Sequence, residues 1–162
     1  MNRTRQILVL ILFLLICYAV AGIGSLFTTS TMGQSGWYAT LPKPSWNPPN
    51  WVFGPVWTVL YTLIAIAGWL VWKTRGSVRA AAMPLALFTI QIILNGAWTI
   101  IFFGQHMPGI AFLDIVILWV FILLTMVVFW RIRPLAGWLF LPYLLWVTYA
   151  STLNYAIWQA MR

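Results

Sequence analysis

Five apolar runs, each about as long as a membrane-spanning helix, dominate this sequence. They lie at about 7–27, 51–72, 80–103, 109–130 and 135–158, with Asn47 as the expected cap of the second run and a kink expected at Pro142 in the last. A helix rises ~1.5 Å per residue, so about 20 apolar residues cross a hydrocarbon core of about 30 Å. A chain of 162 residues that is 63% hydrophobic and 6% charged cannot hide this much apolar surface from water. The sequence therefore predicts an all-α membrane protein, a single five-helix bundle over residues 1–162.

The first run also resembles a secretory signal peptide. A basic start at Arg3 and Arg5, an apolar core and the small residues 19–21 fit that pattern. However, its apolar stretch of about 21 residues is long enough to cross the membrane. This length favours a retained first helix.

The basic residues cluster on one side of the predicted bundle. With five helices, seven of the nine Lys and Arg side chains share the side of the N-terminus: Arg3, Arg5, Lys73, Arg75, Arg79, Arg131 and Arg133. In a plasma membrane the positive-inside rule then puts the N-terminus inside and residues 28–50 outside. This asymmetry explains the net charge of +8 by orientation in the membrane, so nucleic acid is not an expected partner.

The loop at 28–50 and the start of the next run are rich in proline and tryptophan. Four prolines fix the backbone φ angle and remove amide donors: Pro42, Pro44, Pro48 and Pro49. Amphipathic rings of the type found at membrane surfaces lie among them: Tyr38, Trp46 and Trp51. Such a segment is too stiff to be a flexible linker. Two interpretations stay open, a structured lid over a pocket and an interfacial anchor with no ligand beneath it.

Polar and indole side chains recur at helical spacing inside three of the runs. Residues spaced i, i+4 and i+7 or i+8 share one face of a helix. These sets are Trp57, Tyr61 and Ala65; Gln91, Asn95 and Trp98; and Trp146, Ala150 and Asn154. The amides could simply form hydrogen bonds between helices. Their grouping beneath a rigid loop favours a pocket for a flat, largely apolar ligand, built by the second, third and fifth runs.

Few residues could carry acid–base or metal chemistry. Asp114 is the only acid, and it is either a proton or cation site or a neutral carboxyl bonded to an indole N–H. The lack of a second acid favours the latter. His106 is expected in an exposed loop, with haem ligation as the less favoured alternative. Cys17 is expected to be buried and inert, and no metal-ligand cluster or hydrolytic constellation can be built.

The small residues Ala82 and Ala86 lie four positions apart at the start of the third run. Small residues at this spacing let helices approach closely in a membrane. They could serve a homodimer or packing inside the bundle, and the sequence does not choose between these.

Several motifs together resemble one known family. They are Leu41-x-Lys43-Pro44-Ser45-Trp46-x-Pro48-Pro49-x-Trp51, Gly54-Pro55-Val56-Trp57, Gln91-x-x-x-Asn95-x-x-Trp98 and Pro142-Tyr143-Leu144-x-Trp146. On these residues the chain resembles the translocator protein family, also called tryptophan-rich sensory proteins or peripheral-type benzodiazepine receptors. The chain lacks the sterol-recognition pattern of the animal members, so a prokaryotic member fits better, which favours a bacterial cell membrane.

The resemblance implies a five-helix bundle, often a homodimer, whose first loop closes over a ligand cavity. It implies binding of porphyrins such as protoporphyrin IX and haem, and of hydrophobic benzodiazepine-site drugs, in tetrapyrrole transport, sequestration or sensing, with no required cofactor. The ligand-binding residues implied here are Tyr38, Trp46, Pro48, Phe53, Trp57, Asn95, Trp98, Trp146, Ala150, Leu153 and Asn154.

Two alternative functions stay open, and one family property is doubtful. Some bacterial members look able to degrade porphyrin in light, which would use Trp57 and Trp146 here. A small proton-coupled exporter using Asp114 is the second alternative. Sterol binding is doubtful because the sterol-recognition pattern fails: six residues separate Tyr155 from Arg162.

Overall fold

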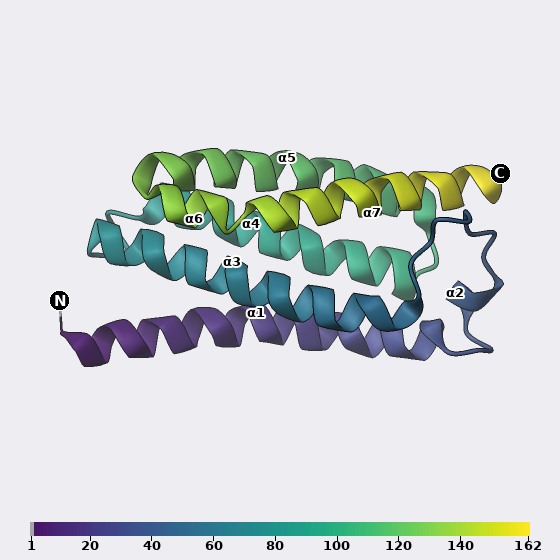
Figure 1. Ribbon diagram of the computed structural model, residues 1–162, viewed down its shortest axis with the longest axis horizontal. Helices are drawn as coiled ribbons and strands as arrows, with labels where there is room; N and C mark the ends of the chain where they lie inside the picture. Colours follow the sequence, from purple (N-terminus) through teal and green to yellow (C-terminus); the bar gives the residue numbers. More distant parts are fainter. Residues whose placement is uncertain (1) are drawn as a thin grey trace.

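The computed structural model describes residues 2–162, and all the regular structure in this range is helical. The long helices lie side by side along one axis, and the two termini lie at opposite ends (Figure 1). The elements are α1 (Arg3–Met32), α2 (Trp37–Thr40), the 3₁₀ turn η1 (Asn50–Val52), α3 (Phe53–Arg75), α4 (Ala82–Thr99), the π-helical turn η2 (Ile100–Gly104), α5 (Pro108–Ile132), α6 (Pro134–Trp138) and α7 (Leu141–Ala160).

Four of these helices are long and apolar enough to cross a membrane, which makes this an integral membrane protein. They are α1, α3 with η1, α4 with η2, and α5. The fifth predicted span is not in this group. Helix α7 has 20 residues and packs along α5, but hydroxyl, amide and aromatic side chains make up half of it, a larger share than in the other four.

The first helix is longer than the apolar run that predicts it. Residues 28–32 were expected to begin the loop, yet they continue α1. Their hydroxyl groups donate to backbone carbonyls three or four residues earlier, as Thr29 does to Ser25 at 2.7 Å and Thr31 does to Phe27 at 2.9 Å. Because the polar side chains find partners within the helix, it extends past its apolar core.

The second helix begins later than predicted. A cap at Asn47 was expected, but α3 starts at Phe53 after the 3₁₀ turn. The Asn47 side chain instead accepts a hydrogen bond from the Tyr38 hydroxyl at 2.8 Å and donates to the Pro48 carbonyl at 3.0 Å. The asparagine therefore holds the loop together rather than starting the helix.

The last predicted helix, 135–158, is broken into α6 and α7. A kink was expected at Pro142, and the break falls just before it, at residues 139–140. Pro142 lies in the first turn of α7, where the missing amide hydrogen has no helical acceptor to lose.

The end of the bundle that holds the N-terminus is packed by a series of phenylalanine rings. Phe13 of α1 meets Phe88 of α4 edge-on at 5.4 Å between ring centroids, and Phe129 of α5 meets Phe140 at 5.2 Å. Gly68 of α3 lies against the first pair. A Cβ atom at Gly68 would come within 2.7–2.9 Å of ring atoms of Phe13 and Phe88. The missing side chain therefore lets α1, α3 and α4 close together.

We expect Gly68→Ala to lower the free energy of unfolding by about 1–3 kcal/mol, because an extra methyl group in a filled core forces the two rings to shift. Gly22→Ala is the matched control, since a Cβ atom there meets nothing within 4 Å. The control should be neutral or more stable by up to about 1 kcal/mol, from helix propensity. Thermal unfolding in detergent measures both. Equal midpoints for the two variants would contradict the packing at Gly68.

Candidate functional site

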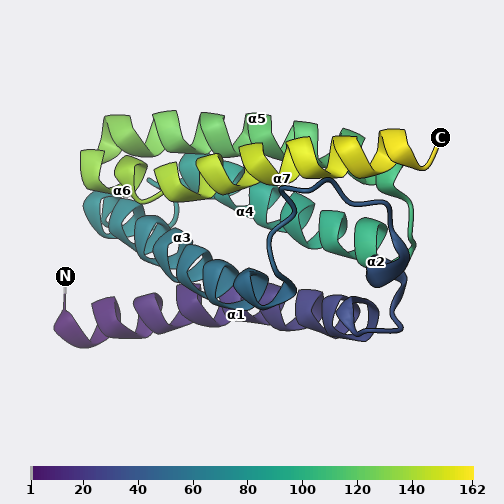
Figure 2. The same ribbon diagram turned by 45° about the vertical axis from the view of Figure 1, so that its right-hand side comes forward.

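The segment between α1 and α3, residues 33–52, crosses the end of the bundle opposite the N-terminus. Figure 2 shows it leaving α1, passing α2, running along α7 and returning to α3. The Asn50 amide donates to the Met32 carbonyl at 2.9 Å, and the Tyr149 hydroxyl of α7 donates to the Trp46 carbonyl at 2.7 Å. We call residues 33–52 the capping segment. These bonds tie it to helices on both sides of the bundle.

Tyr38 is the central side chain of the capping segment. It is 1% exposed, and its ring contacts Phe53 and Phe103 at 6.3 and 5.5 Å between centroids. The Lys43 ammonium donates to the Tyr38 carbonyl at 2.6 Å and lies 4.9 Å from the centre of the Tyr38 ring. Burial raises the pKa of the Tyr38 phenol to about 12. The capping segment is therefore folded around one aromatic ring.

The loop between α4 and α5 also contacts the capping segment. His106 stacks on Trp37 with the ring centroids 4.3 Å apart and the planes 17° apart. The histidine is exposed, as the sequence predicted for a loop position. One face of its ring is covered by the indole, so the stack serves as a contact between the loop and the segment.

A cavity of about 360 Å³ lies among α1, α3 and α4. Four of the predicted ligand-binding residues line it: Phe53, Trp57, Asn95 and Trp98. Phe103 and Tyr61 add two further rings, and Trp57 lies 5.5 Å from Tyr61 between centroids. Aromatic rings therefore form a large part of the walls, and Asn95 is the buried amide among the lining residues.

The cavity opens on the outer surface of the bundle, between α1 and α3. The exposed lining residues on this side are small or carry hydroxyl groups: Gly22, Ser25, Gly54 and Thr58. A Cβ atom at Gly22 or Gly54 would meet nothing within 4 Å, so the opening is unobstructed there. A hydrogen bond of 2.6 Å between the hydroxyls of Tyr18 and Thr62 joins the same two helices farther from the capping segment.

Two other predicted residues, Pro48 and Trp146, line a separate groove of about 730 Å³ between α3 and α7. Phe53 lies between the two hollows, since it lines the cavity and contacts Trp146 at 5.9 Å between centroids. The two indoles expected in one pocket, Trp57 and Trp146, therefore belong to different hollows. Trp46 is half exposed and packs on Tyr149.

The amides mainly join helices, which is the alternative that the sequence left open. Asn95 accepts from the Tyr61 hydroxyl at 2.8 Å and donates to the Tyr143 hydroxyl at 2.6 Å, which links α3, α4 and α7. Asn154 accepts from the Trp98 indole at 2.9 Å and donates to the Pro108 carbonyl at 2.8 Å. Of these two amides, only Asn95 also borders the cavity.

The remaining predicted residues of α7 lie in the packed core. Ala150, Leu153 and Asn154 are all buried and do not line the cavity. The expected pocket wall from α7 is thus replaced by α1, and the Asn154 side chain is used for hydrogen bonds to Trp98 of α4 and Pro108 of α5. The signal missed on α1 was its stripe of Ala21, Ser25 and Thr28, at spacing i, i+4 and i+7 in an otherwise aliphatic helix.

Three buried polar groups have no hydrogen-bond partner among residues 2–162. They are both amide atoms of Gln91, Oδ2 of Asp114 and the indole nitrogen of Trp146. The predicted hydrogen bond from an indole N–H to the Asp114 carboxyl is therefore absent at Oδ2. Buried groups of this kind cost free energy unless water or a ligand meets them.

The comparisons with known proteins agree over nearly the whole chain. Residues 13–159 match the sequence profile described as the TspO/MBR family. The chain is 44% identical to the tryptophan-rich protein TspO of Chlorobaculum tepidum over 96% of its own length and 97% of that protein. It is 44% identical to the translocator protein of Homo sapiens over 76% of its length and 73% of that protein. It is 39% identical to the tryptophan-rich sensory protein of Cereibacter sphaeroides over 93% and 87%.

We expect Asn95→Leu to lower the free energy of unfolding by about 1–2 kcal/mol, because it leaves the buried hydroxyls of Tyr61 and Tyr143 unpaired. The matched background is the double variant Tyr61→Phe, Tyr143→Phe, in which no hydroxyl is left unpaired. There the same replacement should cost much less. Unfolding in detergent measures the four proteins as a cycle. The same cost in both backgrounds would show that the hydrogen bonds contribute little.

Proposed function

Since the chain belongs to the TspO/MBR family, we propose that it binds porphyrins such as protoporphyrin IX and haem, and hydrophobic benzodiazepine-site drugs, in tetrapyrrole transport, sequestration or sensing. The single observation that carries the proposal is the aromatic cavity of about 360 Å³ beside the capping segment. A mainly apolar hollow with a few polar groups at its edge suits a flat, hydrophobic ligand.

The rings of the cavity favour stacking on a planar ligand. Trp57 and Trp98 come from facing helices, and Phe53 joins them from the first turn of α3. Aromatic faces attract a conjugated ring system beyond the effect of buried area alone. A macrocycle larger than the cavity would need more room. Rotation of Phe53 away from Trp146 would join the cavity to the groove of about 730 Å³ and supply it.

In this proposal the capping segment acts as the lid of the site. Tyr38 contacts Phe53, which lines the cavity, so a movement of the segment would change the contacts between Phe53 and a bound ligand. The hydrogen bonds from Asn50 and Tyr149 hold the segment closed. The seven basic residues at the opposite end of the bundle support an orientation with the N-terminus inside and the capping segment outside, in a bacterial cell membrane.

The fifth span and the homodimer also belong to the proposal. Helix α7 lies alongside α5 for most of its length, and the chain ends opposite its start, as five crossings require (Figure 1). Ala82 and Ala86 are both exposed on α4, which leaves this small-residue face free for a second copy of the chain.

We expect Trp57→Ala to weaken protoporphyrin IX binding about tenfold, because it removes one stacking face. The measurement is a titration of the purified full-length protein, followed by the porphyrin absorption band and by tryptophan quenching. Trp138→Ala is the matched control, since it removes an exposed indole on α6, far from the cavity. Absence of saturable binding to the unmodified protein would overturn the proposed function. An equal affinity of both variants would remove Trp57 from the site.

A second candidate function, breakdown of porphyrin in light, is favoured by the rings around Trp57. Its indole lies 5.5 Å from the Tyr61 ring and 6.2 Å from the Tyr143 ring between centroids, and all three side chains can be oxidised. Trp146 lies in the neighbouring groove and contacts Phe53.

We expect illumination of the porphyrin complex in air to bleach the porphyrin absorption band. Trp57→Phe should slow the bleaching, because it replaces the oxidisable indole that lines the cavity with a phenyl ring, while Trp138→Phe should not. A band that is stable in the illuminated wild-type complex would exclude this activity and leave the binding function intact.

A further inference from the structure

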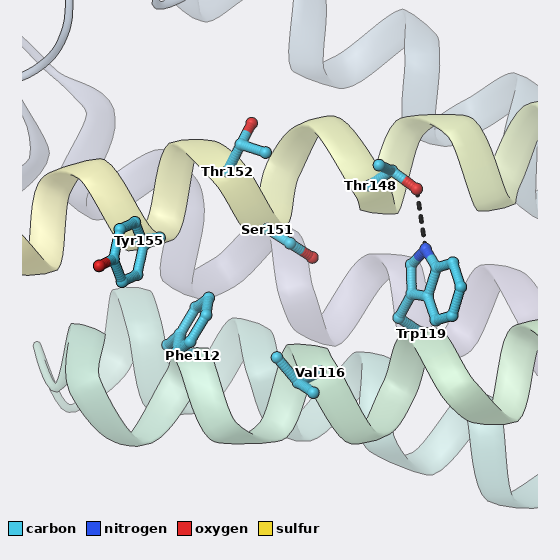
Figure 3. A pocket seen from close by; sticks show the side chains of 7 residues that line it. All are labelled: Phe112, Val116, Trp119, Thr148, Ser151, Thr152 and Tyr155. Atoms are coloured by element: carbon cyan, nitrogen blue, oxygen red, sulfur yellow. Dashed lines mark hydrogen bonds between the residues drawn. The ribbon is translucent and has the colours of Figure 1, made fainter.

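A second kind of hollow lies on the outer face of the bundle, between α5 and α7. It is a groove of about 470 Å³ that shares no residue with the cavity described above. Figure 3 shows its walls: Phe112, Val116 and Trp119 project from α5 toward Thr148, Ser151 and Tyr155 of α7.

The surface of this groove is apolar although hydroxyl groups line it. The Trp119 indole donates to the Thr148 hydroxyl at 2.8 Å and closes one end (Figure 3). The hydroxyls of Thr148, Ser151 and Thr152 each donate to a carbonyl of their own helix at 2.7–2.8 Å. These donors are therefore occupied, and the hollow presents methyl, methylene and ring carbon. Such a surface suits a hydrocarbon chain.

The other end of the groove carries a cation above an aromatic cluster. The Phe112 ring lies 5.2 Å from Tyr155 and 5.7 Å from Trp158 between centroids. Trp158 fits closely against Gly109, where a Cβ atom would come within 2.7 Å of the indole nitrogen. The Arg162 guanidinium lies 5.0 Å from the centre of the Trp158 ring and is exposed. Aromatic rings and basic side chains of this kind mark the depth of the lipid headgroups.

Among residues 2–162, Arg162 is the cation available at this end of the bundle. The other basic residue there, Lys43, donates to three carbonyls of the capping segment, those of Tyr38, Ala39 and Leu41. A guanidinium over an indole keeps its N–H groups free, and these match a phosphate group in two-pronged hydrogen bonds. Tyr155 and Trp158 lie one turn apart on α7, and Arg162, just past the end of the helix, lies over Trp158, so the cation is next to this end of the groove.

We propose that this groove is a binding site for an anionic phospholipid. One acyl chain lies between α5 and α7 with its end toward Trp119, and the phosphate meets the guanidinium of Arg162. The length of the hollow along the helices and the position of the cation at the capping end fit the two parts of one lipid molecule.

The test places a bimane label at Val116→Cys in the groove, in the full-length protein with Cys17→Ala. The protein is reconstituted in vesicles of equal phosphatidylglycerol and phosphatidylcholine, with brominated acyl chains on one lipid or the other. We expect brominated phosphatidylglycerol to occupy the groove about fivefold more than brominated phosphatidylcholine, from the interaction of one cation with one anionic headgroup. Quenching of the bimane fluorescence reports this occupancy.

Three controls separate this site from general attraction to the membrane. Bimane at Ile23→Cys, exposed on α1 at a comparable depth, should show equal quenching by the two lipids. Arg162→Gln should equalise quenching at Val116→Cys, and Arg162→Lys should partly restore the preference. Arg131→Gln, which removes a charge at the opposite end of α5, should leave the preference unchanged.

Three results would overturn the proposal. Equal quenching by both lipids at Val116→Cys would mean that the groove takes bulk lipid without selection. Displacement of brominated phosphatidylglycerol by added cholesterol would make a sterol the preferred occupant. Protection from both brominated lipids would mean that another polypeptide, such as a second copy of the chain, covers the groove.

Discussion

The fold depends on hydrogen bonds that pair the buried amides Asn95 and Asn154 with groups on neighbouring helices. Hydrocarbon offers no hydrogen bonds, so a buried amide or hydroxyl that lacks a partner keeps its full desolvation cost. Asn95 and Asn154 avoid this cost through bonds across helices, with Tyr61 and Tyr143 for the first and Trp98 and Pro108 for the second. These bonds fix the positions of α3, α4, α5 and α7 relative to one another along the axis of the bundle. The apolar side chains pack around them.

Helix α1 differs from the other long helices, and the cavity follows from this difference. It packs on α3 through Phe13 and Cys17 near the N-terminal end, where Gly68 allows close contact. Toward the capping segment it carries small and hydroxyl residues, Gly22, Ser25 and Thr28 among them. Small side chains fill less space between helices of fixed spacing, so a hollow forms beside α3 and α4. The same helix thus provides tight packing at one end and access at the other.

The capping segment lies at the end of the bundle where α1 carries the small residues that line the cavity. Its prolines restrict the backbone, and Tyr38 provides a buried ring around which the segment closes. Its Trp37 stacks on His106 of the α4–α5 loop, and its Tyr38 contacts Phe53, which lines the cavity. The Tyr149 hydroxyl of α7 donates to the carbonyl of its Trp46. A rigid segment with few anchor points can open as one unit, which would suit the proposed exchange of a hydrophobic ligand. On the outer face, the groove between α5 and α7 needs no such cover, because lipid already meets it.

The sequence by itself determined the all-helical membrane class, the approximate bounds of four spans and the position of the stiff segment. Apolar length, proline chemistry and the positions of Arg and Lys act locally, so they can be interpreted without knowing which helices are neighbours. The break before Pro142 and the exposed His106 follow in the same way. Helical spacing also identified the faces of Trp57, Asn95 and Trp98 that border the cavity.

Only the tertiary structure decided which of these faces meet. An amide satisfies its hydrogen bonds equally well with a ligand or with another helix, so spacing alone could not assign Asn154 to packing. The rotation of α7 about its axis separates Trp146 from Trp57, and the approach of α1 supplies the missing wall. Periodicity fixes a side chain's direction relative to its own helix. The identity of the helix that it faces depends on how all the helices pack together.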